Sequence, residues 1–169
     1  MTVLSKTDIE HLMKAESPLI EGWLDLEVQL QPNGFDITLR DIASLETPGT
    51  IAASNSGRKL PNGTALEFDG HAFVNLRPGA YLITYNEIVH LPNNVMALAR
   101  PRSSLLRCGV DIGTAVWDAG YSGRSQSMLV VHNAAGFRLQ KNARVAQMVF
   151  FRLTGETDGY RGVYQGENM

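Results

Sequence analysis

Turn-forming clusters recur along the chain and divide it into short segments, which limits the folds open to it. Between the clusters stand runs of β-branched, aromatic and aliphatic residues, such as Tyr81-Leu82-Ile83-Thr84-Tyr85 and Met128-Leu129-Val130-Val131. Short β-prone runs separated by turns are typical of antiparallel sandwiches and barrels. The sequence therefore predicts an all-β sandwich or barrel, with turns at Pro32-Asn33-Gly34, Pro61-Asn62-Gly63, Pro78-Gly79 and Pro92-Asn93-Asn94.

The clear helix signal lies at the start of the chain. Ser5 with Asp8 three residues later resembles a capping box, and Ile9, Leu12 and Met13 share one helical face. With 44% hydrophobic residues, no internal repeat and no linker, residues 1–169 are expected to form one domain. Gly49 to Gly63 is expected to be a mobile loop. The apolar run from Val149 to Phe151 suits a buried core strand or a subunit contact.

Composition narrows the class of protein. One cysteine, Cys108, fits a reducing compartment, and the sequence shows no membrane-span-length apolar run and no signal-peptide core. These features predict a cytoplasmic protein without a membrane partner. The net charge of −2 argues against a general nucleic-acid binder. Residues 1–99 hold 6 Lys/Arg and 12 Asp/Glu (net −6), whereas residues 100–169 hold 9 and 5 (net +4), so a polyanion would be steered to the second half.

An arginine and serine cluster follows Pro101. The proline is expected to end a strand, and Ser103 and Ser104 to cap a short helical turn whose free N–H groups bind an anion. Arg102 and Arg107 add guanidinium groups that suit phosphate oxygens. The alternative is a capped surface turn with two solvated arginines.

A lone aspartate, Asp118, stands a few residues further on, in Trp117-Asp118-Ala119-Gly120-Tyr121-Ser122-Gly123. A carboxylate beside a phosphate site is what hydrolysis needs to orient and deprotonate water. The alternative is a turn aspartate that only hydrogen-bonds its own backbone. The residues alone leave both readings open.

Longer motifs extend these features into a resemblance. Arg102-Ser103-Ser104-Leu105-Leu106-Arg107, the segment from Thr114 to Gly123, Asn142-Ala143-Arg144-Val145-Ala146-Gln147 and Tyr164-Gln165-Gly166 occur in the order and spacing of the dCTP deaminase and dUTPase superfamily. Nearly the whole chain is covered, and it resembles most the archaeal-type dUTPases. The resemblance implies a distorted jelly roll that assembles as a homotrimer, with each active site built from neighbouring subunits.

The choice of activity depends on one missing acid. Similar deaminases carry a catalytic glutamate on the strand after the Asp-x-Gly-aromatic-x-Gly turn, but between Asp118 and Glu156 this sequence has no Asp or Glu. Hydroxyls and amides cannot replace a carboxylate as proton shuttle near neutral pH. The expected activity is therefore that of a dUTP diphosphatase. The alternatives are a dCTP deaminase or bifunctional enzyme, and a non-catalytic nucleotide-binding module.

The resemblance also implies roles for individual residues. Asp118 would activate the attacking water, Tyr121 would lie against deoxyribose, and backbone groups at Thr114, Ala115 and Val116 would read uracil. The phosphate chain would be held by Arg102, Ser103, Ser104, Arg107 and Gln147. Magnesium is the implied cofactor, held mainly by the triphosphate and water.

The tail and the histidines complete the expectations. The deaminase branch commonly reads Lys-Tyr-Gln-Gly-Gln where this chain has Val163-Tyr164-Gln165-Gly166-Glu167. Glu167 would repel a triphosphate, so either the tail closes over base and sugar or Tyr160, Arg161 and Gln165 take over the contacts. His11, His71, His90 and His132 stand far apart without ligand spacing, so no protein metal site is expected.

Overall fold

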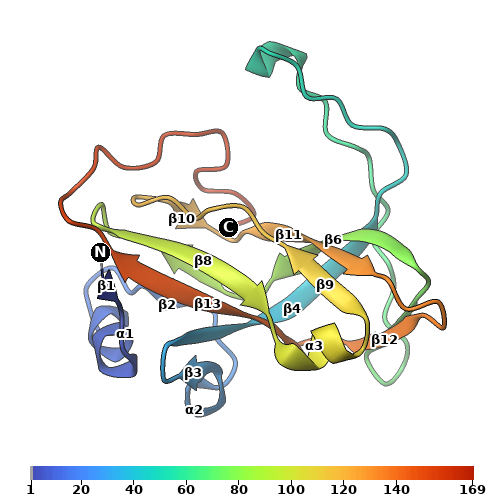
Figure 1. The fold of residues 1–169 in the computed structure, drawn as a ribbon, viewed down its shortest axis with the longest axis horizontal. Helices are drawn as coiled ribbons and strands as arrows, with labels where there is room; N and C mark the ends of the chain where they lie inside the picture. Colours follow the sequence, from blue (N-terminus) through green and yellow to red (C-terminus); the bar gives the residue numbers. More distant parts are fainter. Residues whose placement is uncertain (1) are drawn as a thin grey trace.

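The computed structural model describes residues 2–169, and most of its elements are antiparallel strands (Figure 1). The helices are α1 (Lys6–Met13), α2 (Leu26–Gln29), the 3-10 turn η1 (Asn55–Gly57) and α3 (Ser103–Arg107). The strands are β1 (Thr2–Val3), β2 (Ile20–Glu21), β3 (Leu30–Gln31), β4 (Gly34–Ser44), β5 (Phe73–Leu76), β6 (Gly79–Tyr85), β7 (Ile88–His90), β8 (Val95–Pro101), β9 (Val110–Gly113), β10 (Ser122–Gly123), β11 (Gln126–Val131), β12 (Phe137–Gln140) and β13 (Arg144–Arg152). The predicted all-β class is confirmed.

One large sheet organises this part of the chain. Its eight strands run in the order β1-β13-β4-β6-β11-β9, with β3 paired to β4 and β8 paired to β13, while β10-β7-β2 and β12-β5 form smaller sheets. The first half of β4 pairs with β13 and its second half with β6, and the register shifts between Leu39 and Asp41. Such an irregularity bends a strand, so the sheet curls around its own core. This curl gives the distorted jelly roll.

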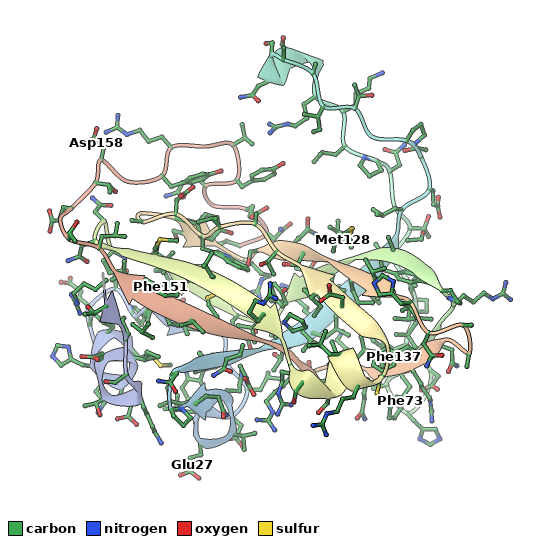
Figure 2. The ribbon with its side chains drawn as sticks, viewed as in Figure 1. Glu27, Phe73, Met128, Phe137, Phe151 and Asp158 are labelled. Atoms are coloured by element: carbon green, nitrogen blue, oxygen red, sulfur yellow. The ribbon has the colours of Figure 1, made fainter. Side chains whose placement is uncertain are left out.

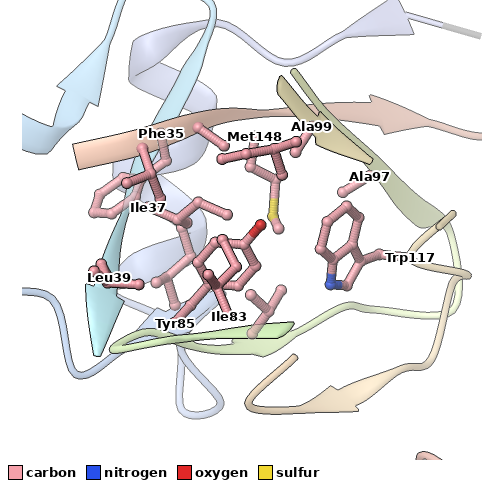
Figure 3. Close-up of a cluster of buried hydrophobic side chains, with 14 of the residues drawn as sticks. Phe35, Ile37, Leu39, Ile83, Tyr85, Ala97, Ala99, Trp117 and Met148 are labelled. Carbon is pink, nitrogen blue, oxygen red and sulfur yellow. The ribbon is translucent and has the colours of Figure 1, made fainter. Parts of the chain in front are cut away.

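The core fills the inside of the curl. Figure 3 shows side chains from β4, β6, β8 and β13 meeting there, with the Trp117 indole beside Ala97. Phe35, Ile83 and Met148 are fully buried. The Trp117 backbone bridges Ala97 of β8, and its indole N–H donates to Ser125 Oγ at 2.9 Å. Because both ends of Trp117 are fixed, the next residue, Asp118, is held at the edge of the core.

The predicted N-terminal helix is confirmed as α1. The Ser5 side chain accepts from the Asp8 backbone N–H, and the Asp8 carboxylate accepts from the Ser5 backbone N–H at 2.9 Å, which completes the capping box. Ile9 is fully buried, and Leu12 and Met13 pack against the core. The turn at Pro32 and Asn33 is also confirmed, since Leu30 pairs with Phe35 and Gln31 with Gly34 across it.

The apolar run in β13 alternates between two environments. Phe150 is fully buried, whereas Val149 and Phe151 are half-buried on the other face of the strand, where Figure 2 labels Phe151. β8 and β4 flank β13 on its two edges along part of its length. The inner face of this run therefore belongs to a core strand of the single chain, which is one of the two interpretations given for it; the subunit contact remains a prediction.

The helix that follows Pro101 differs in detail from its prediction. β8 ends at Pro101 as expected, but Arg102 occupies the N-cap of α3 and makes no side-chain cap bond. Ser103 and Ser104 lie inside the first turn, so the prediction that they cap it is wrong. Arg102 has the extended backbone of a cap residue, and its backbone N–H donates to Val145 O at 3.0 Å, which fixes where the helix starts.

Two segments without long regular structure rise on the same side of the sheet in Figure 1. The first is an arm, residues 45–64, whose two legs pair through Thr50 and Lys59 and whose tip holds η1. The second is a tail, residues 153–169, which returns towards β10 and β11. In the described part of the chain, no helix has the length and apolar character needed to cross a membrane.

Candidate active site

The turn from Asp118 to Tyr121 is built for close packing. The Tyr121 backbone N–H donates to Asp118 O at 3.1 Å, so the turn closes without using the Asp118 carboxylate. Gly120 has φ +83°, and a Cβ there would lie 2.5 Å from Gly159 Cα. Only glycine meets both conditions without strain. The turn is thereby pressed against the start of the tail, where the Tyr160 N–H donates to Ala119 O at 2.8 Å.

This turn forms one side of a pocket of about 380 Å³. The arm provides a second wall, the segment after β9 a third, and the tail a fourth. The pocket is lined by Leu45, Leu60, Pro61, Leu82, Ala115, Val116, Trp117, Asp118, Tyr121, Ser125, Gln126, Tyr160, Tyr164 and Glu167. Mostly apolar walls with a few placed polar groups are typical of small-molecule sites.

Asp118 and Tyr121 present different surfaces to this pocket. The Asp118 side chain is exposed at its rim, where a carboxylate can meet both substrate and water. Tyr121 is buried, with its ring edge-to-face against Tyr160 at a centroid distance of 5.7 Å. Burial, followed by the adjacent Glu167 carboxylate, raises the pKa of the Tyr121 phenol. Tyr121 is thus a neutral aromatic wall that keeps its proton.

The tail is attached to this same turn of its own chain. The Gln165 amide accepts from Ser122 N–H and donates to Gly120 O, both at 3.0 Å. The Tyr121 hydroxyl donates to Glu167 Oε1 at 2.8 Å. Burial raises the pKa of the Glu167 carboxyl, while the Tyr121 hydrogen bond opposes that rise. Gln165 therefore braces the tail, and Tyr160 and Glu167 face the pocket.

A basic cluster lies elsewhere, around the start of α3. Asp36 is almost fully buried, and its Oδ2 contacts both Arg102 Nε and Arg144 Nη1 at 3.1 Å. Burial raises the pKa of the Asp36 carboxyl, and the two arginines oppose that rise. Because Arg102 uses its Nε for Asp36, its two terminal nitrogens remain for another partner.

The other predicted phosphate ligands are near α3 and outside the pocket. Ser103, Ser104 and Arg107 are exposed on the helix. Gln147, on β13, lies opposite Asp36 of β4 and Arg100 of β8. From Ala97, which bridges Trp117, the chain runs four residues along β8 to Pro101, roughly 13 Å at about 3.3 Å a residue, and α3 begins two residues later. Figure 1 places α3 on the opposite side of the sheet from the tail. One chain therefore separates its Asp118 from its own basic cluster.

The strand after the turn, β11, pairs along its full length with β6. Gln126 and Met128 lie on its exposed face, with Met128 labelled in Figure 2, while Ser127 and Leu129 point inward. Gln126 reaches the pocket. No carboxylate comes from this strand, in agreement with its sequence.

Of the predicted substrate-binding residues, Ala115, Val116, Tyr121 and Tyr160 share the pocket with the predicted catalytic residue Asp118. Thr114 lies beside it, with its hydroxyl donating to Ala99 O at 3.3 Å. His90 Nδ1 is 2.7 Å from Ser122 Oγ, and residues 2–169 contain no cluster of three metal-ligating side chains.

Several residues that shape the pocket and the basic cluster carry little signal in the sequence. Asp36 carries no such signal, because nothing local shows that it would be buried beneath Arg102. The contact of Arg144 with Asp36 could not be predicted from the sequence either, because it depends on the pairing of β13 with β4. Trp117 could have been found as the aromatic residue before the aspartate. Glu167 was noted as a departure from the tail pattern, but its contact with the Tyr121 hydroxyl could not be predicted from the sequence.

Comparison with known proteins gives the family. The family model for dCTP deaminase-like proteins matches residues 3–153. The chain is 50% identical over 169 residues to a protein of Methanosarcina acetivorans named as a probable deoxyuridine 5'-triphosphate nucleotidohydrolase, covering 99% of each. A protein of Archaeoglobus fulgidus with the same name is also 50% identical, over all of this chain and 99% of its own. The chain belongs to the dCTP deaminase-like family.

A solved structure agrees on the fold. The 2'-deoxycytidine 5'-triphosphate deaminase of Agrobacterium tumefaciens superposes with a TM-score of 0.67 at 21% identity, over 88% of this chain and 47% of the deaminase chain. This chain thus spans about half the length of that deaminase. The likeness confirms the predicted jelly-roll architecture.

Proposed function

We propose that this protein is a dUTP diphosphatase, which converts dUTP and water to dUMP and pyrophosphate. The observation that carries the proposal is the shared pocket of Asp118 and Tyr121 in a chain 50% identical, over its full length, to proteins named as dUTP nucleotidohydrolases. The absence of an acid between Asp118 and Glu156 argues against deamination. The single cysteine fits a reducing compartment, and we place the protein in the cytoplasm.

In the proposed reaction, the exposed Asp118 carboxylate orients a water molecule and accepts its proton as the water attacks the α-phosphorus. The pyrophosphate then leaves with the electrons of the broken phosphoanhydride bond. The Tyr121 ring lies against deoxyribose, where its bulk leaves no room for a ribose 2'-hydroxyl. Backbone groups at Ala115 and Val116, with Thr114 beside them, read uracil.

We propose that the phosphate chain is held by Arg102, Ser103, Ser104, Arg107 and Gln147 of a neighbouring copy in a homotrimer. The position of the basic cluster outside the pocket, beyond roughly 13 Å of β8 from Ala97 to Pro101, supports this, because Asp118 must reach the α-phosphorus while the basic cluster holds the same phosphate chain. Magnesium fits this site as an ion held mainly by phosphate oxygens and water, with Asp118 as the exposed carboxylate of the pocket, and it would neutralise charge on the phosphates.

An assay with four nucleotides tests the reaction. The protein is incubated with dUTP, dCTP, dTTP and UTP in the presence of magnesium, and nucleotides, pyrophosphate and ammonia are separated and measured. We expect pyrophosphate from dUTP and no ammonia from dCTP. Ammonia from dCTP at a comparable rate would indicate a deaminase, and binding without turnover would indicate a nucleotide-binding module.

Mixing two inactive variants tests the shared site. An Asp118→Asn chain and an Arg107→Ala chain are co-expressed with different tags, and the mixed oligomers are isolated. In a ring of like contacts, each isolated mixed trimer has one site of three that combines an intact Asp118 with an intact Arg107, so about a third of wild-type activity returns. A mixture no more active than the separate variants would place both residues in one chain's site.

A further inference from the structure

An exposed apolar surface lies on residues 23–28, the segment that leads into α2, and we call it the α2 platform. Trp23, Leu24 and Val28 are 43%, 49% and 45% exposed. Single exposed apolar side chains are ordinary, but three within six residues mark a surface that binding would bury. The segment is also acidic, because residues 21–28 contain three Asp/Glu and no Lys or Arg.

A buried amide holds the α2 platform in one shape. Gln29 Oε1 accepts from the Leu24 N–H at 2.7 Å and from the Asp25 N–H at 2.9 Å. Gln29 Nε2 donates to Glu87 Oε1 at 2.7 Å and to Asp36 O at 2.9 Å, and the Gln29 and Glu87 side chains are both buried. Because this segment is already ordered, a partner that binds it loses little affinity to conformational entropy.

The α2 platform is continuous with the basic cluster. Arg144 Nη1 donates to Val28 O at 2.8 Å and to Asp36 Oδ2 at 3.1 Å, and Asp36 also holds Arg102. In the proposed trimer the basic cluster of one copy faces the pocket of a neighbouring copy. The α2 platform, one contact away from that cluster, therefore faces the segments that flank the neighbour's pocket.

The arm is the flanking segment that matches the α2 platform. It walls the pocket through Leu60 and Pro61, and its upper part, residues 50–60, carries two cations, Arg58 and Lys59, and no acid. Ile51 and Leu60 are 80% and 60% exposed. Figure 1 shows the arm standing away from the sheet on the side opposite α2, so the arm of one chain points away from its own platform.

We propose that the upper arm of one copy docks on the α2 platform of the next copy, with apolar side chains in contact and the arm's cations beside the platform's acids. This inference rests on the proposed function, in which neighbouring copies share a site. The contact joins two different surfaces, so it runs head to tail and can close into a ring. It fixes the arm as a wall of the pocket and brings the neighbour's basic cluster towards that pocket. The opposite charges at its rim set the register.

Cross-linking between differently tagged chains tests the contact directly. In a Cys108→Ser background, which removes the native cysteine, one chain carries Leu24→Cys and the other Ile51→Cys. After co-expression and treatment with a short bismaleimide, we expect a covalent pair that contains both tags, and none from either chain expressed alone. Val3→Cys replaces Leu24→Cys in the control, because Val3 is also 49% exposed but lies on β1.

A charge exchange tests the predicted register. Glu27→Lys and Lys59→Glu should each raise the dissociation constant of the assembly about tenfold or more, as measured by sedimentation equilibrium, and the two together should restore most of the affinity. Trp23→Ser should weaken assembly by at least about tenfold, because it removes a large apolar anchor. Glu16→Lys, at an exposed acid outside the platform, should change little.

The outcomes separate this contact from the proposed reaction. A mixed pair with restored affinity supports the docking. A link within one chain, a pair formed by either variant alone, or unchanged assembly of Trp23→Ser overturns it, and the last result assigns the platform to another partner. Pyrophosphate release from dUTP by wild type is scored separately. A wild type that hydrolyses dUTP as a trimer but gives no mixed pair disproves the arm contact alone, and a mixed pair without turnover disproves the dUTP diphosphatase alone.

Discussion

The pocket and the basic cluster at α3 differ in the sign of their charge and in how that charge is held. The pocket presents Asp118 and Glu167 from a turn and a tail, with aromatic walls between them. The basic cluster presents Arg102 and Arg144 from the ends of a helix and a strand, both tied to buried Asp36. The first surface suits a nucleoside and the second suits a phosphate chain.

The comparison shows that charge along the sequence is a poor guide to charge in a site. Residues 100–169 carry a net +4, yet two of their five acids line the pocket. The basic cluster, in turn, is anchored by an acid from the other half of the chain. Folding therefore puts acidic groups in the pocket and basic groups at α3. In the proposed trimer, the pocket of one copy meets the basic cluster of a neighbouring copy.

The largest expected effect comes from Asp118→Asn. The change keeps the side-chain shape but removes the base, so turnover of dUTP should fall by roughly 10²–10⁴-fold while affinity for the α,β-imido analogue of dUTP is largely kept. Stopped assays of pyrophosphate release and calorimetry measure the two. Asp111→Asn, an exposed acid on β9, is the control. Near-normal turnover in Asp118→Asn would mean that another group activates the water.

Arg107→Ala tests the basic cluster. It removes a cation expected to make charge-assisted hydrogen bonds to phosphate, so kcat/KM for dUTP should fall at least about ten- to a hundredfold. Binding of dUMP should change much less. Arg138→Ala, which pairs with Asp69 on the surface, should leave both unchanged. Equal losses for dUTP and dUMP together with a lower Tm would assign Arg107 a structural role.

Asp36→Asn addresses how the arginines are held. Without the carboxylate, Arg102 and Arg144 lose their common partner, so kcat/KM for dUTP should fall by roughly tenfold while deoxyuridine binding in the pocket is unchanged. Asp41→Asn breaks an exposed ion pair and is the control. Loss of deoxyuridine binding along with dUTP turnover would contradict an effect confined to the basic cluster.

The same variant has a pH signature. Because burial raises the pKa of Asp36 above its ordinary value of 3.8, the folded chain holds this proton to higher pH than the unfolded chain. Between those two pKa values the folded state binds more protons, so this group's contribution to the free energy of unfolding falls as pH rises. Thermal melts across that pH range should show this loss of stability with rising pH in wild type and not in Asp36→Asn. The same dependence of Tm on pH in both proteins would contradict a raised pKa of Asp36.

The smallest expected effect is that of salt. Added salt screens exposed arginines, so affinity for the imido analogue should weaken as ionic strength rises from 0.05 to about 0.5 M. Deoxyuridine, which carries no charge, should bind the pocket equally well throughout. Calorimetry on both ligands checks the contrast. A matching loss for deoxyuridine would show that the pocket itself depends on long-range charge.

Local chemistry made much of the fold predictable. The capping box at Ser5 and the turn at Pro32 and Asn33 depend on residues a few positions apart, and both appear as expected. The serine cap at α3 was wrong because a long-range bond from Arg102 N–H to Val145 O set the helix start instead. That bond joins residues far apart in the chain, and no local pattern reports it.

The candidate site divides in the same way. The sequence by itself determined the β class, the glycine that lets the Asp118 turn pack closely, and the absence of an acid on β11, because each depends on residue type and short spacing. Only the tertiary structure decided that Asp36 lies beneath two arginines, that Glu167 faces Tyr121, and that α3 stands apart from the pocket. Those relations depend on strand pairing and on the length of β8, which bring together or separate residues regardless of their distance in sequence.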